Sequence, residues 1–322
     1  MPSSGRLSPR VDARGLAAAA SAFLIWGLMP LYLMQLGHVP VLQVTAHRLV
    51  WACAIAVAWL WIRGELPQVW AALSNPGVRW RLFASAALIS ANWMTYIWGV
   101  TTNRIVETSL GYFINPLLNV LLGVVVLSER LSIAQWTSVA IAAAGVSYLT
   151  WTAGHPPWIA LILAFAFGLY GLVRKVVKVD ALAGFASETL LLLPIGLAYL
   201  VWCEIIGSGT FAHAGMRTDV LLALSGPFTA VPLVLFAVGA RLIPYSTVGL
   251  LQYLAPTIQL LLAVLVYDEP FSGPRVIGFT LIWMALAIYA ADGMWRSSAS
   301  RATGQLAAGQ LARSKKSDSS RR

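Results

Sequence analysis

The chain has 322 residues, of which 59% are apolar and only 11% are charged. Soluble domains hold about 45–50% apolar and about 25% charged residues, so this composition excludes a single soluble core and predicts an all-α membrane protein. The formal net charge is +10, but the basic residues gather in the tail after Trp295 and at the ends of apolar runs. That placement is typical of membrane flanks and argues against nucleic acid as a partner.

Ten apolar runs follow one another, and each has about the length of a membrane-spanning helix. We expect these helices at residues 16–35, 41–62, 81–101, 106–127, 133–152, 157–173, 181–203, 219–239, 245–266 and 274–294. Residues 1–15 and 296–322 are rich in Ser, Arg, Gly and Ala, which predicts two disordered ends, the second of them basic. Cys53 and Cys203 lie in apolar runs, so we expect buried thiols rather than a disulfide.

Two segments of the chain, 107–132 and 247–272, match at a constant offset of 140 positions. The offset aligns a proline inside the run, a glutamate at its end and a serine after it: Pro116 with Pro256, Glu129 with Glu269, and Ser132 with Ser272. Chance rarely aligns three such residues together. The match therefore predicts an internal repeat.

The repeat divides the chain into two units of five helices each, at 16–152 and 157–294. Five is an odd number, so the second unit enters the membrane in the opposite sense to the first. The predicted fold is thus ten transmembrane helices in two inverted five-helix repeats, a plan that many secondary transporters share.

The distribution of Lys and Arg predicts which side of the membrane each loop occupies. If the N-terminus is cytoplasmic, the outer loops hold only Arg104, Arg217 and Arg275, and nearly all other basic residues lie on the inner side. We therefore expect both termini in the cytoplasm.

Two charged side chains, Arg48 and Glu188, are predicted to lie at membrane depth, each about eight residues into its span. They are equivalent under the 140 offset, and the helical rise places them at similar depths. A buried charge is expensive unless it is paired or hydrated, so we expect both to face a common central cavity. The alternative is that neighbouring groups satisfy each one locally. His47 and Glu188 are the mid-membrane titratable groups that proton coupling could use.

Aromatic and amide side chains gather in the third and fourth runs. Those expected to line a substrate path with Arg48, Glu188 and His47 are Trp93, Tyr96, Asn115 and Tyr112. Aromatic rings with a few convergent amides suit an amphipathic ligand, although hydrogen bonding between helices explains the amides equally well. Pro116 and Pro256 are candidate hinges, since a proline inside a helix removes a backbone hydrogen bond. Glu129 and Glu269, with the serines that follow them, are expected to stabilise helix ends.

Motifs of known enzymes are missing from the sequence: it has no nucleotide-binding loop, no HExxH, no CxxC and no GxSxG. Its four histidines are scattered. We therefore expect no enzyme activity, no catalytic residue, no cofactor and no metal site. The expected partners are a small-molecule substrate, the lipid bilayer and, if transport is coupled, protons, with the chain acting as a monomer or homodimer.

Several of these stretches resemble the RarD group of permeases, in the EamA branch of the drug/metabolite transporter superfamily. They are FLIWGLMPLY (23–32), NWMTYIWGV (92–100), ETSLGYFINPLLNVLLGVVVLSERL (107–131) and LLQYLAPTIQLLLAV (250–264). The resemblance implies ten transmembrane helices in two inverted halves, a place in the inner membrane of the cell, and efflux or exchange of small molecules. In this group an acidic residue usually follows the segment that corresponds to HVPVL (38–42), whereas this chain has Gln43 at that position.

These observations together predict a secondary transporter that moves a small organic metabolite or drug-like solute by alternating access. The alternative, from a different class, is a membrane scaffold or sensor subunit that keeps a transporter fold without transporting.

Overall fold

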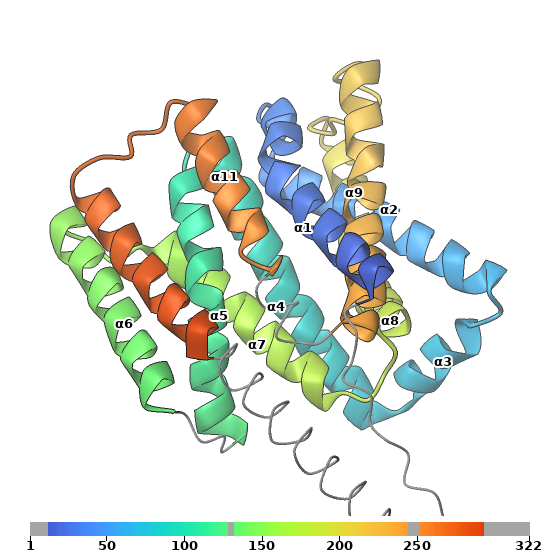
Figure 1. The fold of residues 1–322 in the computed structure, drawn as a ribbon. Coiled ribbons are helices and arrows are strands. Elements are labelled where there is room, and N and C mark those ends of the chain that lie inside the picture. The colour runs from blue at the N-terminus through green and yellow to red at the C-terminus, as the bar shows by residue number, and fades with distance from the viewer. Residues whose placement is uncertain (1–11, 128–131, 244–250, 293–322) are drawn as a thin grey trace, which may run out of the picture.

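A computed structural model describes residues 12–127, 132–243 and 251–292 of the protein. These residues form helices, turns and loops, and none of them lies in a strand. The described part of the chain is therefore all-helical, as predicted from its composition (Figure 1).

The first half of the chain forms six helices and one short 3-10 turn. They are α1 (Ala13–Leu33), η1 (Met34–Leu36), α2 (Val41–Ile62), α3 (Leu66–Ser74), α4 (Pro76–Thr101), α5 (Ile105–Leu127) and α6 (Ile133–Ala153). The second half forms α7 (Trp158–Val176), α8 (Ala181–Ile205), α9 (Met216–Leu242), α11 (Leu254–Leu265) and a final helix, Pro274–Asp292. Each of the ten predicted runs contains one of these helices, although part of the ninth run lies in residues 244–250, outside the described residues.

Among the described residues, five helical segments are both long enough and apolar enough to cross a membrane. They are Ala13–Leu36, Val41–Ile62, Ala181–Ile205, Met216–Phe236 and Pro274–Asp292. The shorter segments Trp158–Arg174 and Leu254–Leu265 are also apolar. The described chain therefore has enough apolar helix for several membrane passes, while the count of ten passes stays a prediction.

Helix α3 is an element that the sequence analysis missed. Its nine residues are too few to span a bilayer, so a search for apolar runs leaves this region as a loop. Its buried residues, Val69 and Ala72, fix it to the bundle, while Trp70 on its other side is exposed. The next helix also begins earlier than predicted, because the Asn75 side chain accepts a hydrogen bond from the N–H of Val78 and caps α4.

Helices from opposite halves of the chain pack against each other through small residues. Helix α1 lies against α9, and α5 lies against α7 (Figure 1). A Cβ atom on Gly239 of α9 would come within 2.7 Å of Ala19 of α1, and one on Gly111 of α5 would come within 2.8 Å of the Ala160 carbonyl of α7. Only glycine permits such close approach of two backbones.

Helix α2 lies against both α8 and α9, at the other end of the bundle from α6 and the final helix (Figure 1). Gly226 of α9 faces the backbone of Trp51, where a Cβ atom would come within 2.7 Å of the Trp51 carbonyl carbon. At the opposite end, Gly145 of α6 faces the Gly278 carbonyl, 3.1 Å from where its own Cβ atom would stand. The charged residues Arg48 and Glu188 therefore lie on neighbouring helices, α2 and α8.

Two of the predicted helix-end residues have the expected structural role. Ser132 caps α6: its hydroxyl accepts from the N–H of Gln135 at 3.0 Å, and the Gln135 side chain accepts from the Ser132 N–H at 3.0 Å. The Glu269 carboxylate accepts from the N–H groups of Ile105 and Val106, at 2.5 and 2.9 Å. Glu269 thus stabilises the N-terminus of α5, a helix of the other half. Its sequence counterpart, Glu129, lies outside the described residues.

Burial raises the pKa of the Glu269 carboxyl above its ordinary value, and its two backbone hydrogen bonds and the nearby charge of Arg275 act in the opposite direction. The carboxylate is only 7% exposed, so its hydrogen bonds are largely shielded from water.

Candidate functional site

Arg48 lies on α2, inside the bundle, and only 6% of it is exposed. Its Nε–H donates a hydrogen bond of 2.7 Å to the hydroxyl of Thr229 on α9. Its guanidinium carbon stands 4.6 Å from the ring centre of Trp93 on α4, which is the geometry of a cation–π contact. Within the described residues, these are the direct contacts that hold the guanidinium in place.

Tyrosines surround this guanidinium on three helices. Tyr32, Tyr96 and Tyr112 all lie within electrostatic range of Arg48. The Tyr96 and Tyr112 rings meet edge to face with their centres 5.6 Å apart. Tyr32 donates a hydrogen bond of 2.7 Å to the Leu221 carbonyl. The structure therefore brings together Arg48, Trp93, Tyr96 and Tyr112, four of the residues that the sequence analysis placed on the substrate path.

The amide of Asn92 joins three helices. Its Nδ2 donates to the Leu163 carbonyl of α7 at 3.0 Å, and its Oδ1 accepts from the Tyr112 hydroxyl of α5 at 3.2 Å. Since both ends of the amide are occupied, Asn92 holds α4, α5 and α7 together, as interhelical hydrogen bonding predicts.

The amide of Asn115 is in the opposite situation. It is fully buried on α5, yet neither its nitrogen nor its oxygen has a hydrogen-bond partner among the described residues. The hydroxyl of Tyr96, which is 4% exposed, is likewise unbonded. Buried polar groups without a partner are uncommon and call for an explanation such as a bound ligand or water.

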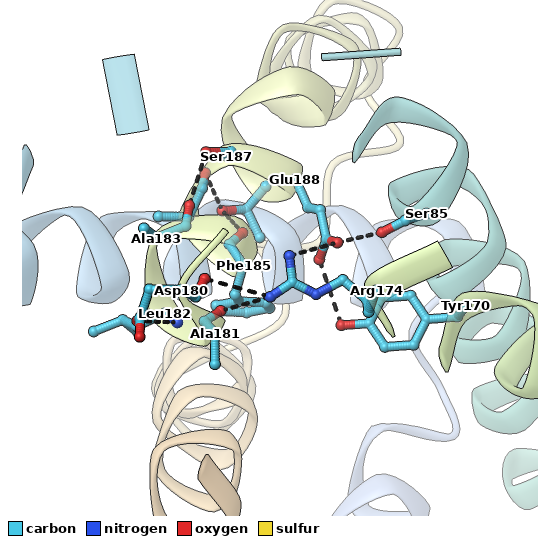
Figure 2. Close-up of polar contacts among 12 residues, drawn as sticks. Ser85, Tyr170, Arg174, Asp180, Ala181, Leu182, Ala183, Phe185, Ser187 and Glu188 are labelled. Carbon is cyan, nitrogen blue, oxygen red and sulfur yellow. Dashed lines mark hydrogen bonds and ion pairs between the residues drawn. The ribbon is translucent and has the colours of Figure 1, made fainter. Parts of the chain in front are cut away.

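Glu188 lies on α8 and is 2% exposed. Figure 2 shows its carboxylate between Ser85, Tyr170 and the guanidinium of Arg174. The Ser85 hydroxyl donates to it in a short hydrogen bond, the Tyr170 hydroxyl donates at 3.5 Å, and Arg174 Nη1 stands 3.6 Å away. Glu188 thus has its own basic partner from α7.

Arg174 reaches Glu188 because a glycine makes room for it. The Arg174 Nη2 donates to the Ala181 carbonyl at 3.1 Å, at the start of α8, so its guanidinium lies along that helix (Figure 2). A Cβ atom on Gly184 would coincide with this guanidinium. Gly184 is therefore the residue that admits the Arg174 side chain to the buried carboxylate.

The two predicted charges do not pair with each other in this structure, but they share a neighbour. The shared neighbour is Trp93. Its ring contacts the guanidinium of Arg48, and together with Glu188 it lines a small cavity between α2, α4 and α8. This cavity has a volume of about 10 Å³, which is space for about one water molecule. Leu49, Trp93 and Phe185 are among its lining residues, whereas Arg48 is not. A common central cavity that both charges face therefore stays a prediction.

His47 and Gln43 point toward the loop between α8 and α9 rather than toward Arg48. The His47 ring stacks on Phe211 with ring centres 5.1 Å apart. The Gln43 amide donates to the Ser208 carbonyl at 2.7 Å and accepts from the Thr210 N–H at 2.9 Å. Adjacent residues of a helix diverge by about 100°, which explains why His47 and Arg48 face different surroundings.

The two predicted hinge prolines occupy different positions. Pro116 lies inside α5, whereas Pro256 is the third residue of α11. The first N–H groups of a helix have no partner within it, so Pro256 removes no intrahelical hydrogen bond. The interruption in this region comes before it, in a turn at Gln252 and Tyr253. Helix α9 has two further interior prolines, Pro227 and Pro232, which flank Thr229 and which the sequence analysis did not single out.

The residues that the sequence analysis missed are those whose role depends on another helix. Thr229, Ser85 and Tyr170 are common residue types inside apolar runs, and Arg174 comes directly after the predicted run 157–173, where it looks like a loop residue.

Comparison with known proteins adds the family to this geometry. The model of the EamA-like transporter family matches residues 13–151. An uncharacterized transporter of Pseudomonas aeruginosa is 44% identical over 285 residues, which cover 88% of this chain and 95% of that protein. The proteins named RarD from Streptomyces exfoliatus and Escherichia coli are 41% and 38% identical, over 91% and 88% of this chain and 93% and 95% of theirs.

A solved crystal structure has a similar fold, with a TM-score of 0.57 over 85% of this chain and 96% of the other. The two sequences are 21% identical, so this likeness concerns the fold alone.

Proposed function

Since the chain belongs to the EamA-like transporter family, among relatives that include the RarD proteins, we propose that it is a secondary transporter of a small organic metabolite or drug-like solute. It is a multi-pass membrane protein, and we place it in the inner membrane with both termini in the cytoplasm. Relatives named as transporters and as RarD match it over 88% of its length, which supports the proposed transport function.

The observation that carries the proposal is a set of polar groups buried inside the helix bundle. Arg48, Asn115 and Glu188 are at most 6% exposed, on helices that are otherwise strongly apolar. Ionisable residues within membrane-spanning helices generally face a solute or ion pathway, because burying them in lipid would be costly. We propose a path through the centre of the bundle lined by Arg48, Trp93, Tyr96, Tyr112, Asn115 and Glu188, with His47 nearer to the outer loops.

Alternating access between two inverted halves is the proposed mechanism. The exchange of partners between halves supports it: the first helix of each half lies against the third long helix of the other, α1 on α9 and α7 on α4. Gly239 and Gly99, which correspond at the offset of 140, stand at these two contacts, against Ala19 and Ile159. In this conformation the small cavity beside Trp93 is closed to a solute, so the helices must separate to load the path. Pro116 and Pro256 remain the proposed hinges, and proton coupling would use Glu188 or His47.

Solute flux in proteoliposomes tests this function. A panel of labelled metabolites and drug-like solutes is measured with the wild-type protein, Arg48→Ala, Glu188→Ala and the double variant, each checked for folding by gel filtration. We expect flux of at least one solute to fall about tenfold or more in each single variant, and the losses to be non-additive in the double variant because both residues contact Trp93 or its cavity. Absence of flux for the whole panel with well-folded wild-type protein would favour the scaffold or sensor alternative.

A further inference from the structure

Arg48 is a buried cation to which the described residues supply no acidic partner. The buried carboxylate of Glu188 is paired with Arg174, whose Nη1 lies 3.6 Å from Glu188 Oε1. The hydrogen bond from Arg48 to another described residue goes from Nε to the neutral hydroxyl of Thr229, and its other close contact is the Trp93 ring. No ion pair joins Arg48 to any acidic residue among the described ranges 12–127, 132–243 and 251–292. Of the twelve acidic residues of the chain, only Glu129 and Asp318 lie outside these ranges.

An arginine stays charged even when it is buried, so the missing countercharge must come from outside the protein or from water. The cation–π contact with Trp93 and the bond to Thr229 offset part of the cost of removing this charge from water, but neither neutralises it. The four N–H donors on the two Nη atoms make no hydrogen bond to the described residues. They form a planar edge of the kind that binds a carboxylate through two parallel hydrogen bonds.

The surroundings of this edge define the rest of a ligand. Trp93, Tyr96 and Tyr112 supply aromatic surface around the guanidinium. The unbonded hydroxyl of Tyr96 and the unbonded amide of Asn115 supply polar atoms that no described residue uses. A site of this kind suits a molecule with one anionic end, an aromatic or apolar body and a few polar substituents.

We propose that Arg48 binds the carboxylate of an organic anion whose aromatic or apolar body lies against Trp93, Tyr96 and Tyr112, an inference that rests on the proposed transport function and names its substrate class. Bound anion supplies the countercharge that the described residues do not. Glu188, which already has Arg174, plays no part in neutralising Arg48. Cations are rejected by the same guanidinium, and neutral analogues leave it unpaired.

Ligand-induced stabilisation of the full-length protein in detergent tests this inference without any measurement of transport. The probes are three matched compounds, 3-phenylpropionate, 3-phenylpropanamide and 3-phenylpropylamine, titrated up to about 10 mM while the melting temperature is followed. We expect 3-phenylpropionate to stabilise the protein saturably, and the amide and the amine to require at least about tenfold higher concentrations for the same shift. Equal or stronger stabilisation by the amide or the amine would overturn the proposal, as would no saturable effect of 3-phenylpropionate or an equal effect of chloride alone.

Two substitutions and a matched control attach the effect to Arg48. Arg48→Gln should abolish the preference for the anion, and Thr229→Val, which leaves the charge but removes its hydrogen bond, should weaken anion binding several-fold. Arg104→Gln is the control, because Arg104 also stands over a tryptophan ring, at 5.2 Å from Trp98, but is exposed outside the bundle. An anion preference that survives in Arg48→Gln, anion binding that is not weakened in Thr229→Val, or a preference that is lost in Arg104→Gln would contradict the assignment.

Binding and transport can fail separately. Anion-selective stabilisation without flux would leave the binding site in place and overturn the transport function. Flux of neutral or cationic solutes without anion-selective stabilisation would support the transport function and overturn the proposed anion site.

Discussion

Two buried asparagines on adjacent helices show how the same side chain serves different purposes at the residue scale. Asn92 uses both ends of its amide to join α4 to α5 and α7. Asn115, equally buried, uses neither end within the described residues. A polar group that stabilises a bundle must be bonded, so Asn115 is better explained by a ligand or water than by packing.

This difference predicts opposite outcomes for two identical substitutions. Asn92→Leu removes two interhelical hydrogen bonds and leaves the Leu163 carbonyl and the Tyr112 hydroxyl without their partner. We expect it to lower the free energy of unfolding by about 1–3 kcal/mol. Asn115→Leu removes no bond to a described residue, so stability should be unchanged or slightly higher while solute flux falls.

Melting temperatures in detergent and flux in proteoliposomes measure the two effects in parallel. The matched pair is its own control, since both substitutions replace a buried amide with an apolar side chain of similar size. A large loss of stability in Asn115→Leu would show that this amide has a structural partner after all.

At the scale of elements, α7 and α8 are joined by the contact that a missing side chain allows. Gly184 of α8 leaves the space through which Arg174 of α7 reaches the carboxylate of Glu188 (Figure 2). The contact depends on the close fit of α7 and α8. If these helices move apart, the interaction between Glu188 and Arg174 weakens. The ion pair is thus coupled to the packing of this helix pair.

Gly184→Ala should displace the Arg174 guanidinium without changing any charge. A Cβ atom at this position overlaps a flexible side chain, so the arginine moves and Glu188 loses its partner. We expect a loss of about 1–3 kcal/mol in stability and a reduced rate of flux. Gly171→Ala on α7 is the matched control, because a Cβ atom there meets nothing within 4 Å and should be neutral or slightly stabilising.

Glu269 makes a second contact between elements of different halves. Its carboxylate accepts from two N–H groups at the start of α5, whereas an alanine would leave both donors unsatisfied in a shielded position. We expect Glu269→Ala to lower the free energy of unfolding by about 1–3 kcal/mol. Glu269→Gln keeps one acceptor and should lose less, and equal melting temperatures for the two variants would argue against a capping role.

On the scale of the whole molecule, the proposed inverted arrangement makes a prediction about topology. An even number of membrane passes places the two chain ends on the same side, and the excess of Lys and Arg in alternate loops predicts that this side is the cytoplasm. Fluorescent-protein fusions to either end should therefore fluoresce, and alkaline phosphatase fusions to either end should be inactive.

A single cysteine placed at Arg104 tests the outer side. Cys53 and Cys203 are buried free thiols, so replacing them with alanine or serine gives a background without other reactive groups. An impermeant maleimide should label position 104 in intact cells and leave a cysteine at position 63, in the loop after α2, unlabelled. The reverse pattern, or chain ends on opposite sides, would contradict the proposed arrangement.

The sequence by itself was sufficient for the class of protein and for most helices. Apolar runs predict helices because a backbone in lipid must bond internally, and nine of the ten runs coincide with a helix whose ends differ by only a few residues. It also singled out Arg48, Trp93, Tyr96 and Tyr112, which lie together, because charged and aromatic residues are conspicuous inside apolar segments.

Tertiary structure alone decided which groups are satisfied and by whom. Glu188 is paired with Arg174, and Asn92 is bonded to Leu163 and Tyr112. Arg48 and Asn115, in contrast, keep polar atoms that no described residue bonds. The short helix α3 was also not predicted from the sequence, because its nine residues are too few to form an apolar run of membrane-spanning length. The physical reason is that helix formation in a membrane depends on local composition, while the pairing of buried polar groups depends on contacts between residues that are far apart in the chain.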